Sequence, residues 1–371
     1  MSRFLNIAML SVHSSPLGRL GASDTGGMSV YVLELASELG RKGHHVDIFT
    51  RQTAPEGDEV YDYAPNVRII ALAVAGTENL QRTELFVHLH RYASAIESFR
   101  NRSGVVYDLL HSNYWLSGVV GEQIKMVWCC PHLITFHTLA AAKMAALQGH
   151  TEHQKRIYWE ARLLRTCNGV IVPTVEETKY CDSILDSKGS KVNQRPWGVN
   201  TDRITTTAHQ GSTVNIDGLE SEPLLRIVGR FDPMKGIDLA LRGFSRLAYV
   251  LEVHLALIGG DEPESCSYQR IKRLVTDLGL GAKVHLLGRV EHEQMVLYYQ
   301  RADLVAVPSL YESFGLVILE ALASGTPVAA TSVGIAPHVI QQGKNGYLAA
   351  PGDEDSMIQA MSKSLMLARR Q

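Results

Sequence analysis

The sequence predicts an α/β protein made of two doubly wound, Rossmann-like domains that face each other across a cleft. The chain has 371 residues, of which 45% are apolar, and this is too long for one ordinary hydrophobic core. Short apolar runs alternate with amphipathic stretches, a pattern typical of parallel sheets covered by helices. A polar stretch with little periodicity, residues 205–222, separates two such series and indicates the linker. We therefore expect domains at residues 1–200 and 201–371.

The first series supplies the elements of the N-terminal domain. Apolar runs predict strands at residues 6–12, 46–50, 67–72, 109–111, 132–135 and 169–173. Apolar residues at helical spacing predict helices at residues 28–42, 84–100, 116–126 and 153–166. The run at 6–12 contains Asn6, is too short for a membrane span and precedes no signal-cleavage pattern, so we expect it to be a first buried strand.

The second series supplies the C-terminal domain. Apolar runs predict strands at residues 224–229, 253–259, 284–287, 304–308 and 327–330. A helix is expected to begin near Gly315, because Leu316, Leu319 and Ala323 share one face, and to stop at Gly325. Ligands of open α/β sheets bind at the carboxyl ends of the strands, so functional residues are expected in the loops that follow them.

Composition excludes several classes of function. The formal net charge is -2 at pH 7 and there is no sustained run of Lys or Arg, which argues against a nucleic-acid or membrane-surface protein. The five cysteines form no C-x-x-C pair, which suits reduced thiols in a cytoplasmic protein and argues against structural zinc. The acidic run 353–355 precedes a helical stretch and is better explained as a cap than as a metal site. We expect no cofactor and no metal.

Two glutamates stand eight positions apart in the loop and helix after the strand at 304–308. Glu312 precedes the helix and Glu320 lies inside it. The helix start also supplies backbone N–H groups at residues 313–317 without intrahelical partners, which suit phosphate or sugar hydroxyls. A carboxylate can accept hydrogen bonds from sugar hydroxyls. Taken singly, Glu312 is better explained as a solvated glutamate and Glu320 as a glutamate on a helix face.

The string from residue 302 to residue 327 closely resembles the Glu-x7-Glu motif of retaining glycosyltransferases of the GT-B fold, family 4. The resemblance covers nearly the whole chain and is nearest the sucrose-phosphate synthase and mycothiol-pathway branch. It implies that Glu312 lies near the donor sugar and Glu320 on the nucleotide ribose. It also implies donor contacts from the backbone of Ser313, Phe314, Gly315 and Leu316.

Other donor-side residues follow from the same resemblance. Gly26 and Gly27 belong to a loop, residues 23–29, that is similar to the Asp-x-Gly-Gly loop of this branch; an ordinary glycine turn is the alternative. Arg230 and Lys235 resemble the family's Gly-Arg-x4-Lys phosphate site, and two cations there can stabilise a diphosphate leaving group. Arg289 is a further expected donor contact.

Acceptor-side residues are expected in the N-terminal domain. His137 ends a strand in a His-Thr-Leu string and, by resemblance, lies beside the transferred sugar. The same resemblance implies that Tyr114 and Thr138 contact the acceptor. Arg156 and Arg82 match basic residues that hold an acceptor phosphate in some relatives. From spacing alone, Arg156 could instead form a surface i,i+4 ion pair with a glutamate one turn later.

The resemblance implies a metal-independent, retaining hexosyltransferase. Its N-terminal domain is expected to bind a small sugar or cyclitol acceptor, with or without a phosphate. Its C-terminal domain is expected to bind a nucleotide diphosphate sugar, with UDP-glucose and UDP-N-acetylglucosamine the leading candidates. No G-x-G-x-x-G follows a predicted strand, which argues against a dehydrogenase. A nucleotide-sugar-binding protein with little turnover is the alternative, because a helix that crosses back to the first domain in relatives is expected to be missing here.

Overall fold

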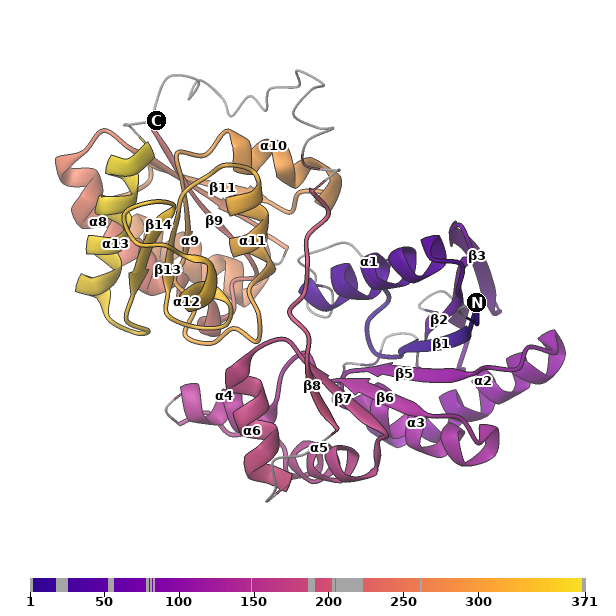
Figure 1. Ribbon diagram of the computed structural model, residues 1–371. Coiled ribbons are helices and arrows are strands. Elements are labelled where there is room, and N and C mark those ends of the chain that lie inside the picture. The colour runs from indigo at the N-terminus through magenta and orange to yellow at the C-terminus, as the bar shows by residue number, and fades with distance from the viewer. Residues whose placement is uncertain are drawn as a thin grey trace. The chain divides into compact units, whose positions relative to one another are not determined.

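The computed structural model describes residues 3–17, 26–52, 57–77, 80, 82, 84–147, 149–185, 191–201, 204, 223–260 and 262–368. The described chain forms two compact units whose boundary lies between Pro196 and Trp197 (Figure 1). The predicted linker, residues 205–222, and residues 23–25 of the predicted glycine loop lie outside the described residues.

The N-terminal unit is built on an eight-stranded sheet. Its strand order is β3-β4-β2-β1-β5-β6-β7-β8, and every neighbouring pair is parallel except β3 with β4. The strands are β1 Asn6–Ser11, β2 His45–Arg51, β3 Glu59–Ala64, β4 Val67–Leu72, β5 Leu109–Asn113, β6 His132–Thr135, β7 Gly169–Val172 and β8 Val192–Gln194.

Helices cover both faces of this sheet. Helix α1 lies on one face, while α2, α3 and α5 lie on the other (Figure 1). Apolar side chains of α1, such as Val32 and Ala36, pack on Met9 and Ile48 of the sheet and bury that face. The helices are α1 Gly27–Arg41, a 3-10 turn η1 Leu85–His88, α2 Leu89–Ser103, α3 Trp115–Trp128, α4 Ala140–Ala146, α5 Gln154–Thr166 and α6 Val175–Leu185.

The C-terminal unit is built on a six-stranded, all-parallel sheet. Its order is β11-β10-β9-β12-β13-β14. The strands are β9 Leu224–Val228, β10 His254–Ile258, β11 Val284–Gly288, β12 Leu304–Val307, β13 Val328–Thr331 and β14 Gly346–Ala349. The helices and 3-10 turns are η2 Pro233–Lys235, α8 Ile237–Val250, α9 Cys266–Asp277, η3 His292–Gln294, α10 Met295–Gln300, α11 Leu316–Ala323, α12 Ala336–Val339 and α13 Glu354–Ala368.

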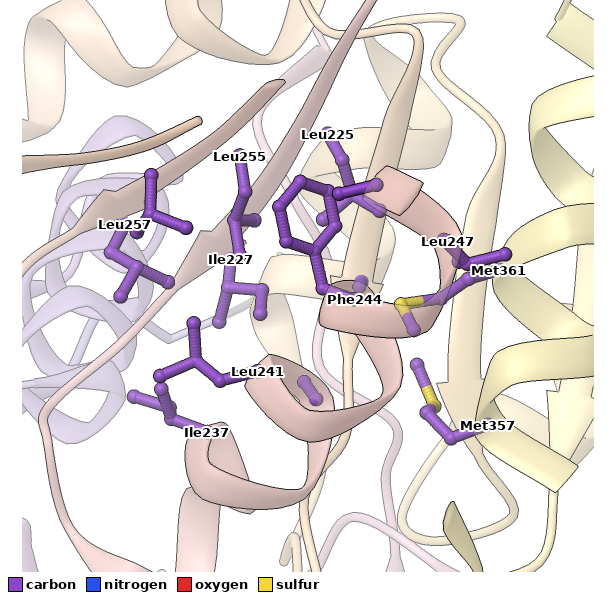
Figure 2. Close-up of a cluster of buried hydrophobic side chains, with 14 of the residues drawn as sticks. Leu225, Ile227, Ile237, Leu241, Phe244, Leu247, Leu255, Leu257, Met357 and Met361 are labelled. Atoms are coloured by element: carbon purple, nitrogen blue, oxygen red, sulfur yellow. The ribbon is translucent and has the colours of Figure 1, made fainter. Parts of the chain in front are cut away.

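Apolar side chains of α8, α9 and α13 form the core on one face of this sheet. Figure 2 shows Leu241 and Phe244 of α8 and Met361 of α13 gathered with strand residues such as Ile227. Helices α10, α11 and α12 pack on the opposite face. With both faces covered, the strands are continuous apolar runs rather than alternating ones, which is why they were visible in the sequence.

The predicted fold class is confirmed, since both units are doubly wound α/β sheets. The helix predicted at 84–100 is partly wrong, because the chain first makes the 3-10 turn η1 and only then α2. The acidic run at 353–355 does cap a helix: Asp353 accepts a hydrogen bond from the Ser356 N–H at 2.9 Å. None of the described helices combines the length and apolar character that crossing a membrane would require.

Each sheet has one strand at which the winding reverses, and the loops that follow it gather at one edge. In the N-terminal unit this strand is β1, which lies between β2 and β5; in the C-terminal unit it is β9, which lies between β10 and β12. Loops at such a reversal diverge and leave room for a ligand. In each unit, a ligand site is therefore expected among the residues that follow these strands: those after β1 and β5, and those after β9 and β12.

Candidate functional site

Lys235 and Glu312 meet at the carboxyl edge of the C-terminal sheet. Lys235 ends η2, which follows β9, and its Nζ donates to Oε1 of Glu312 at 2.6 Å. The hydroxyl of Ser309, just after β12, donates to the same oxygen at 2.8 Å. In turn, Thr331 of β13 donates to the carbonyl oxygen of Ser309 at 2.5 Å. Three strand ends thus cooperate to fix one carboxylate oxygen.

Gly236 makes this meeting possible. Its φ of 63° is left-handed, and a Cβ on it would lie 2.0 Å from the carbonyl oxygen of Pro308. A glycine is therefore required for the loop after β9 to approach the end of β12 so closely.

The second oxygen of the Glu312 carboxylate, Oε2, accepts no hydrogen bond from any residue that the structure describes. The Glu312 side chain is 14% exposed, so Oε2 is available to a ligand hydroxyl.

The N-terminus of α11 lies next to this carboxylate in sequence and is rigidly held. Gly315 is the N-cap with a φ of 102°, and Phe314 before it is buried against the ring of Trp197, with centroids 5.0 Å apart. The N–H of Ile335 donates to the Phe314 carbonyl oxygen at 2.7 Å. The first-turn N–H groups of α11 lack acceptors within the helix, and this end suits an anion or a hydroxyl.

Among the described residues, only one oxygen of the Glu320 carboxylate accepts a hydrogen bond from a side chain. Its Oε2 accepts from the hydroxyl of Tyr299 at 2.7 Å, while Nε2 of His292 stays 4.0 Å from Oε1. Two predicted donor-binding cations have acidic neighbours: Arg230 lies 3.7 Å from Asp232, and Arg289 pairs with an exposed glutamate at 2.8 Å. We call Arg230, Lys235, Ser309, Glu312 and Glu320 the C-terminal cluster; hydrogen bonds join Lys235, Ser309 and Glu312, whereas Arg230 and Glu320 are included as residues predicted on the donor side.

In the N-terminal unit, His137 follows β6 in a strained conformation. Its φ is 62°, and its Nε2 is 2.9 Å from Oδ1 of Asn113, the last residue of β5. The ring of Tyr31 lies edge-on at 5.1 Å. Non-glycine residues at positive φ cost free energy and gather at functional sites. Tyr114, next along the chain from Asn113, is a second such residue, with a φ of 75°.

Cations and a histidine surround the Tyr114 ring. The guanidinium carbon atoms of Arg82 and Arg156 lie over the ring, 5.8 Å and 5.2 Å from its centroid, respectively. The ring of His13 lies 4.5 Å away on a centroid-to-centroid measure. We call His13, Arg82, Tyr114, His137 and Arg156 the N-terminal cluster. It brings together the residues predicted on the acceptor side.

Arg156 does form the i,i+4 ion pair with Glu160, but the predicted surface location of that pair is wrong, because both side chains are buried. Its side chain is only 5% exposed, and its Nε bonds to Glu160 at 2.6 Å while Nη1 pairs with Glu152 at 3.0 Å. Its Nη2 donates to both the carbonyl oxygen and the hydroxyl of Thr138, at 2.8 Å and 3.0 Å. Most of its N–H groups are therefore already used, and Arg156 anchors Thr138 and Tyr114. Arg82 is half-buried and pairs with no carboxylate among the described residues.

His13 is a member that the sequence did not point to. It follows β1 and is buried, and its Nδ1 finds no hydrogen-bond partner in the described structure. Burial, together with the charges of Arg82, His137, Arg51 and Arg156, lowers the pKa of His13 well below its ordinary value. The ring is neutral as a result. Its place after the first strand, at the reversal point of the sheet, was the available signal.

The predicted glycine pair begins α1. Gly26 is its N-cap, and its carbonyl oxygen accepts from the Ser29 N–H at 2.9 Å. An added Cβ on Gly26 would meet nothing within 4 Å. No protein atom in the described chain therefore explains a glycine here. Within the same described residues, no group of three or more His, Cys, Asp or Glu side chains is arranged to hold a metal ion.

Two protein families match the chain. The model of the glycosyl transferases group 1 matches residues 215–369, and that of glycosyltransferase family 4 matches residues 25–203. A D-inositol 3-phosphate glycosyltransferase of Corynebacterium efficiens is 34% identical over 356 residues, covering 93% of this chain and 83% of that protein. The enzyme of that name from Mycolicibacterium paratuberculosis is 35% identical over 360 residues, covering 96% and 81%.

Two solved structures are also similar to this chain. The sucrose-phosphate synthase of Thermosynechococcus elongatus superposes with a TM-score of 0.86 at 31% identity, covering 98% of this chain and 90% of that one. The catalytic domain of starch synthase IV from Arabidopsis thaliana superposes with a TM-score of 0.73 at 16% identity, covering 100% and 93%. At that identity the second likeness concerns the fold alone.

Proposed function

We infer that this chain, which belongs to the group 1 and family 4 glycosyltransferases, moves a hexose from a nucleotide diphosphate sugar to a hydroxyl of a small phosphorylated sugar or cyclitol. In this proposal the anomeric configuration is retained and no metal ion takes part. Residues 1–200 bind the acceptor and residues 201–371 bind the donor. UDP-glucose and UDP-N-acetylglucosamine are the leading donors. A cytoplasmic location stays a prediction from the reduced-cysteine composition.

The C-terminal cluster supplies the donor chemistry. As the bond between the sugar C1 and the diphosphate oxygen breaks, negative charge grows on the leaving group, and Arg230 and Lys235 stabilise it. The N–H groups at the start of α11 add further donors for the diphosphate. Oε2 of Glu312 accepts from a hydroxyl of the transferred sugar and fixes its orientation. The remaining proposed donor contacts are Arg289, Ser313, Phe314, Gly315, Leu316 and Glu320, together with Gly26 and Gly27.

The proposed displacement occurs on one face of the sugar. The acceptor hydroxyl attacks C1 from the side that the diphosphate leaves, its proton passes to the departing diphosphate oxygen, and the new glycosidic bond keeps the original configuration. Glu312 orients the donor in this scheme and is not a nucleophile. In this scheme His137, whose Nε2–H donates to Oδ1 of Asn113, lies beside the transferred sugar, and its Nδ1 accepts a hydrogen bond from one of the sugar hydroxyls.

The observation that carries the phosphorylated acceptor is the half-buried guanidinium of Arg82 over the Tyr114 ring. Arg156 shares that ring but is neutralised by two glutamates, so Arg82 brings the uncompensated positive charge. Arginine binds phosphate oxygens bidentately. The Thr138 hydroxyl, held by Arg156, offers a further contact. The two similar inositol 3-phosphate glycosyltransferases and the similar sucrose-phosphate synthase support the same class of acceptor.

Nucleotide release tests this function. UDP-, ADP- and GDP-sugars are each incubated with the chain, with and without inositol 3-phosphate or fructose 6-phosphate, and the free nucleotide is measured. The proposal expects one pair to release nucleotide at least tenfold faster than the donor alone, with no change on addition of EDTA. NMR of the product gives its anomeric configuration. Tight UDP binding with no stimulated release across the panel favours instead a nucleotide-sugar-binding protein.

A further inference from the structure

We propose that Tyr299 is a positioning residue: its hydroxyl holds one oxygen of Glu320 so that the other oxygen accepts from the ribose hydroxyls of the donor nucleotide. The inference rests on the proposed function, in which Glu320 binds the ribose. It adds a residue that neither the Glu-x7-Glu spacing nor the resemblance pointed to.

The contact itself is short and sheltered. Tyr299 lies in α10 and is 1% exposed, and its Oη donates to Oε2 of Glu320 in α11 at 2.7 Å. The Glu320 side chain keeps 16% of its surface exposed, so a ligand can reach the carboxylate. A buried donor on one oxygen and an exposed second oxygen give the carboxylate a single orientation.

Tyr299 is itself held from two sides. Its carbonyl oxygen accepts from the hydroxyl of Thr326, the second residue after Ser324 at the end of α11, at 2.6 Å. The preceding carbonyl oxygen, that of Tyr298, accepts from the buried guanidinium of Arg226 in β9. Consecutive carbonyls of α10 are thus tied to the loop after α11 and to the sheet. The tyrosine hydroxyl therefore has little freedom to follow a displaced Glu320.

The direction of the hydrogen bond is fixed by protonation. Burial, reinforced by the neighbouring Glu320, raises the pKa of the Tyr299 hydroxyl well above its ordinary value. Tyr299 therefore stays a donor, and Glu320 remains an acceptor. Oε1 of Glu320 is 4.0 Å from His292, too far for a hydrogen bond, and no other described side chain bonds to it. Oε1 of Glu320 can therefore accept a hydrogen bond from a ribose hydroxyl.

The chain offers a matched pair of variants. Tyr299→Phe removes the hydroxyl that bonds to Glu320 and keeps the buried ring. Tyr298→Phe removes the hydroxyl of the neighbouring tyrosine, whose ring packs against Arg226. Calorimetric titration with UDP and with 2′,3′-dideoxy-UDP measures what the ribose hydroxyls contribute. The wild type is expected to prefer UDP by at least tenfold, since each hydroxyl bonded to a carboxylate stabilises binding. Tyr299→Phe should reduce that preference to about twofold, and Tyr298→Phe should keep it.

The possible outcomes distinguish a failure of the Tyr299 positioning role from a failure of the proposed glycosyltransferase function. An unchanged preference for UDP in Tyr299→Phe overturns the positioning role. Equal weakening of both nucleotides in that variant also overturns it, because this result would reflect a packing defect alone. A wild type that binds both nucleotides equally well removes the ribose contact and the inference, while leaving UDP binding intact. A wild type that binds neither UDP, ADP nor GDP overturns the proposed function itself.

Discussion

At the scale of single residues, the main result is the contact of Lys235 with Glu312. In the structure the lysine charge is balanced by a carboxylate, and a diphosphate would provide a second, stronger partner for the same cation. The two side chains thus act as a unit, since Lys235 fixes one oxygen of Glu312 and thereby directs the other. Neither role can be removed without disturbing its partner.

This coupling predicts non-additive kinetics. Lys235→Ala and Glu312→Gln should each lower kcat by about 10²- to 10³-fold, as loss of one charge-stabilising group does elsewhere. The double variant should be at most about tenfold slower than the worse single variant, because both changes break one unit. Steady-state kinetics on the three variants measures this. Arg246→Ala removes an exposed ion pair with Asp355 and serves as the control with unchanged kcat. Losses that simply multiply would contradict the coupling.

Arg156 shows what sequence spacing could and could not give at this scale. The i,i+4 spacing correctly paired it with Glu160. Spacing said nothing of burial, which arises because Thr138 and Tyr114 arrive from other strand ends to cover the guanidinium. The same limit hid Ser309 and Tyr299. Their importance lies in which carboxylate oxygen they touch, and that depends on contacts between distant segments.

At the scale of elements, the position of the α11 N-terminus depends on a close backbone approach. Gly334 has a φ of 57°, and a Cβ there would lie 2.3 Å from the Phe314 carbonyl oxygen and 3.0 Å from Cβ of Glu312. The helix end and the carboxylate are therefore both pressed against this glycine. Gly325, which follows α11, is also left-handed, with a φ of 83°, yet its added Cβ would meet nothing within 4 Å.

The two glycines give a matched prediction. Gly325→Ala should lower the free energy of unfolding by about 1 kcal/mol through backbone strain alone and leave donor binding unchanged. Gly334→Ala carries the same strain and must also move residues 312–314, so UDP affinity should fall by about tenfold or more. Thermal unfolding and calorimetric titration measure both quantities. If Gly334→Ala bound UDP as Gly325→Ala does, the approach would not matter for the site.

Strong apolar runs explain which elements the sequence revealed. The buried parallel strands were predicted because their side chains are apolar on both faces. Strands β3, β8 and β14 were missed: β3 is largely exposed at a sheet edge, β8 has three residues, and β14 begins at a glycine. Short helices such as α10 and α12 span too few turns for a periodic pattern, whereas α6, α8 and α9, with 11, 14 and 12 residues, are long enough to show one and were also not predicted. Their positions are set by packing.

At the scale of the whole molecule, buried histidines make the stability of the N-terminal unit depend on pH. Burial lowers the pKa of His111 from 6.5 to about 4. Between those values the unfolded chain binds more protons than the folded chain, so stability falls as the pH is lowered from 6.5 toward 4. His132 acts in the same direction, because burial, then Lys125 and His111, lowers its pKa to about 3.

Denaturant unfolding at pH 6.5 and pH 5.0 tests this. Each of the two histidines should contribute a loss of about 1.6 kcal/mol over that interval, because an unfolded histidine is already half protonated at pH 6.5 and gains only the remaining half proton by pH 5.0. His111→Asn should reduce the pH-dependent loss by that amount, whatever it does to stability at pH 6.5. Replacement of the exposed His90 by Asn is the control and should leave the loss unchanged. Equal pH dependence in wild type and His111→Asn would rule out this assignment.

The central claim is that a glycosyltransferase of this family uses Arg82 to hold the phosphate of its acceptor. The most direct measurement is kcat/KM for inositol 3-phosphate and for inositol, in the wild type and in Arg82→Ala, with UDP-N-acetylglucosamine as donor. The account predicts that the wild type prefers the phosphorylated acceptor and that Arg82→Ala loses about 10- to 100-fold with it, while unphosphorylated inositol is affected by less than about twofold. Equal losses with both acceptors, or a wild type indifferent to the phosphate, would contradict it.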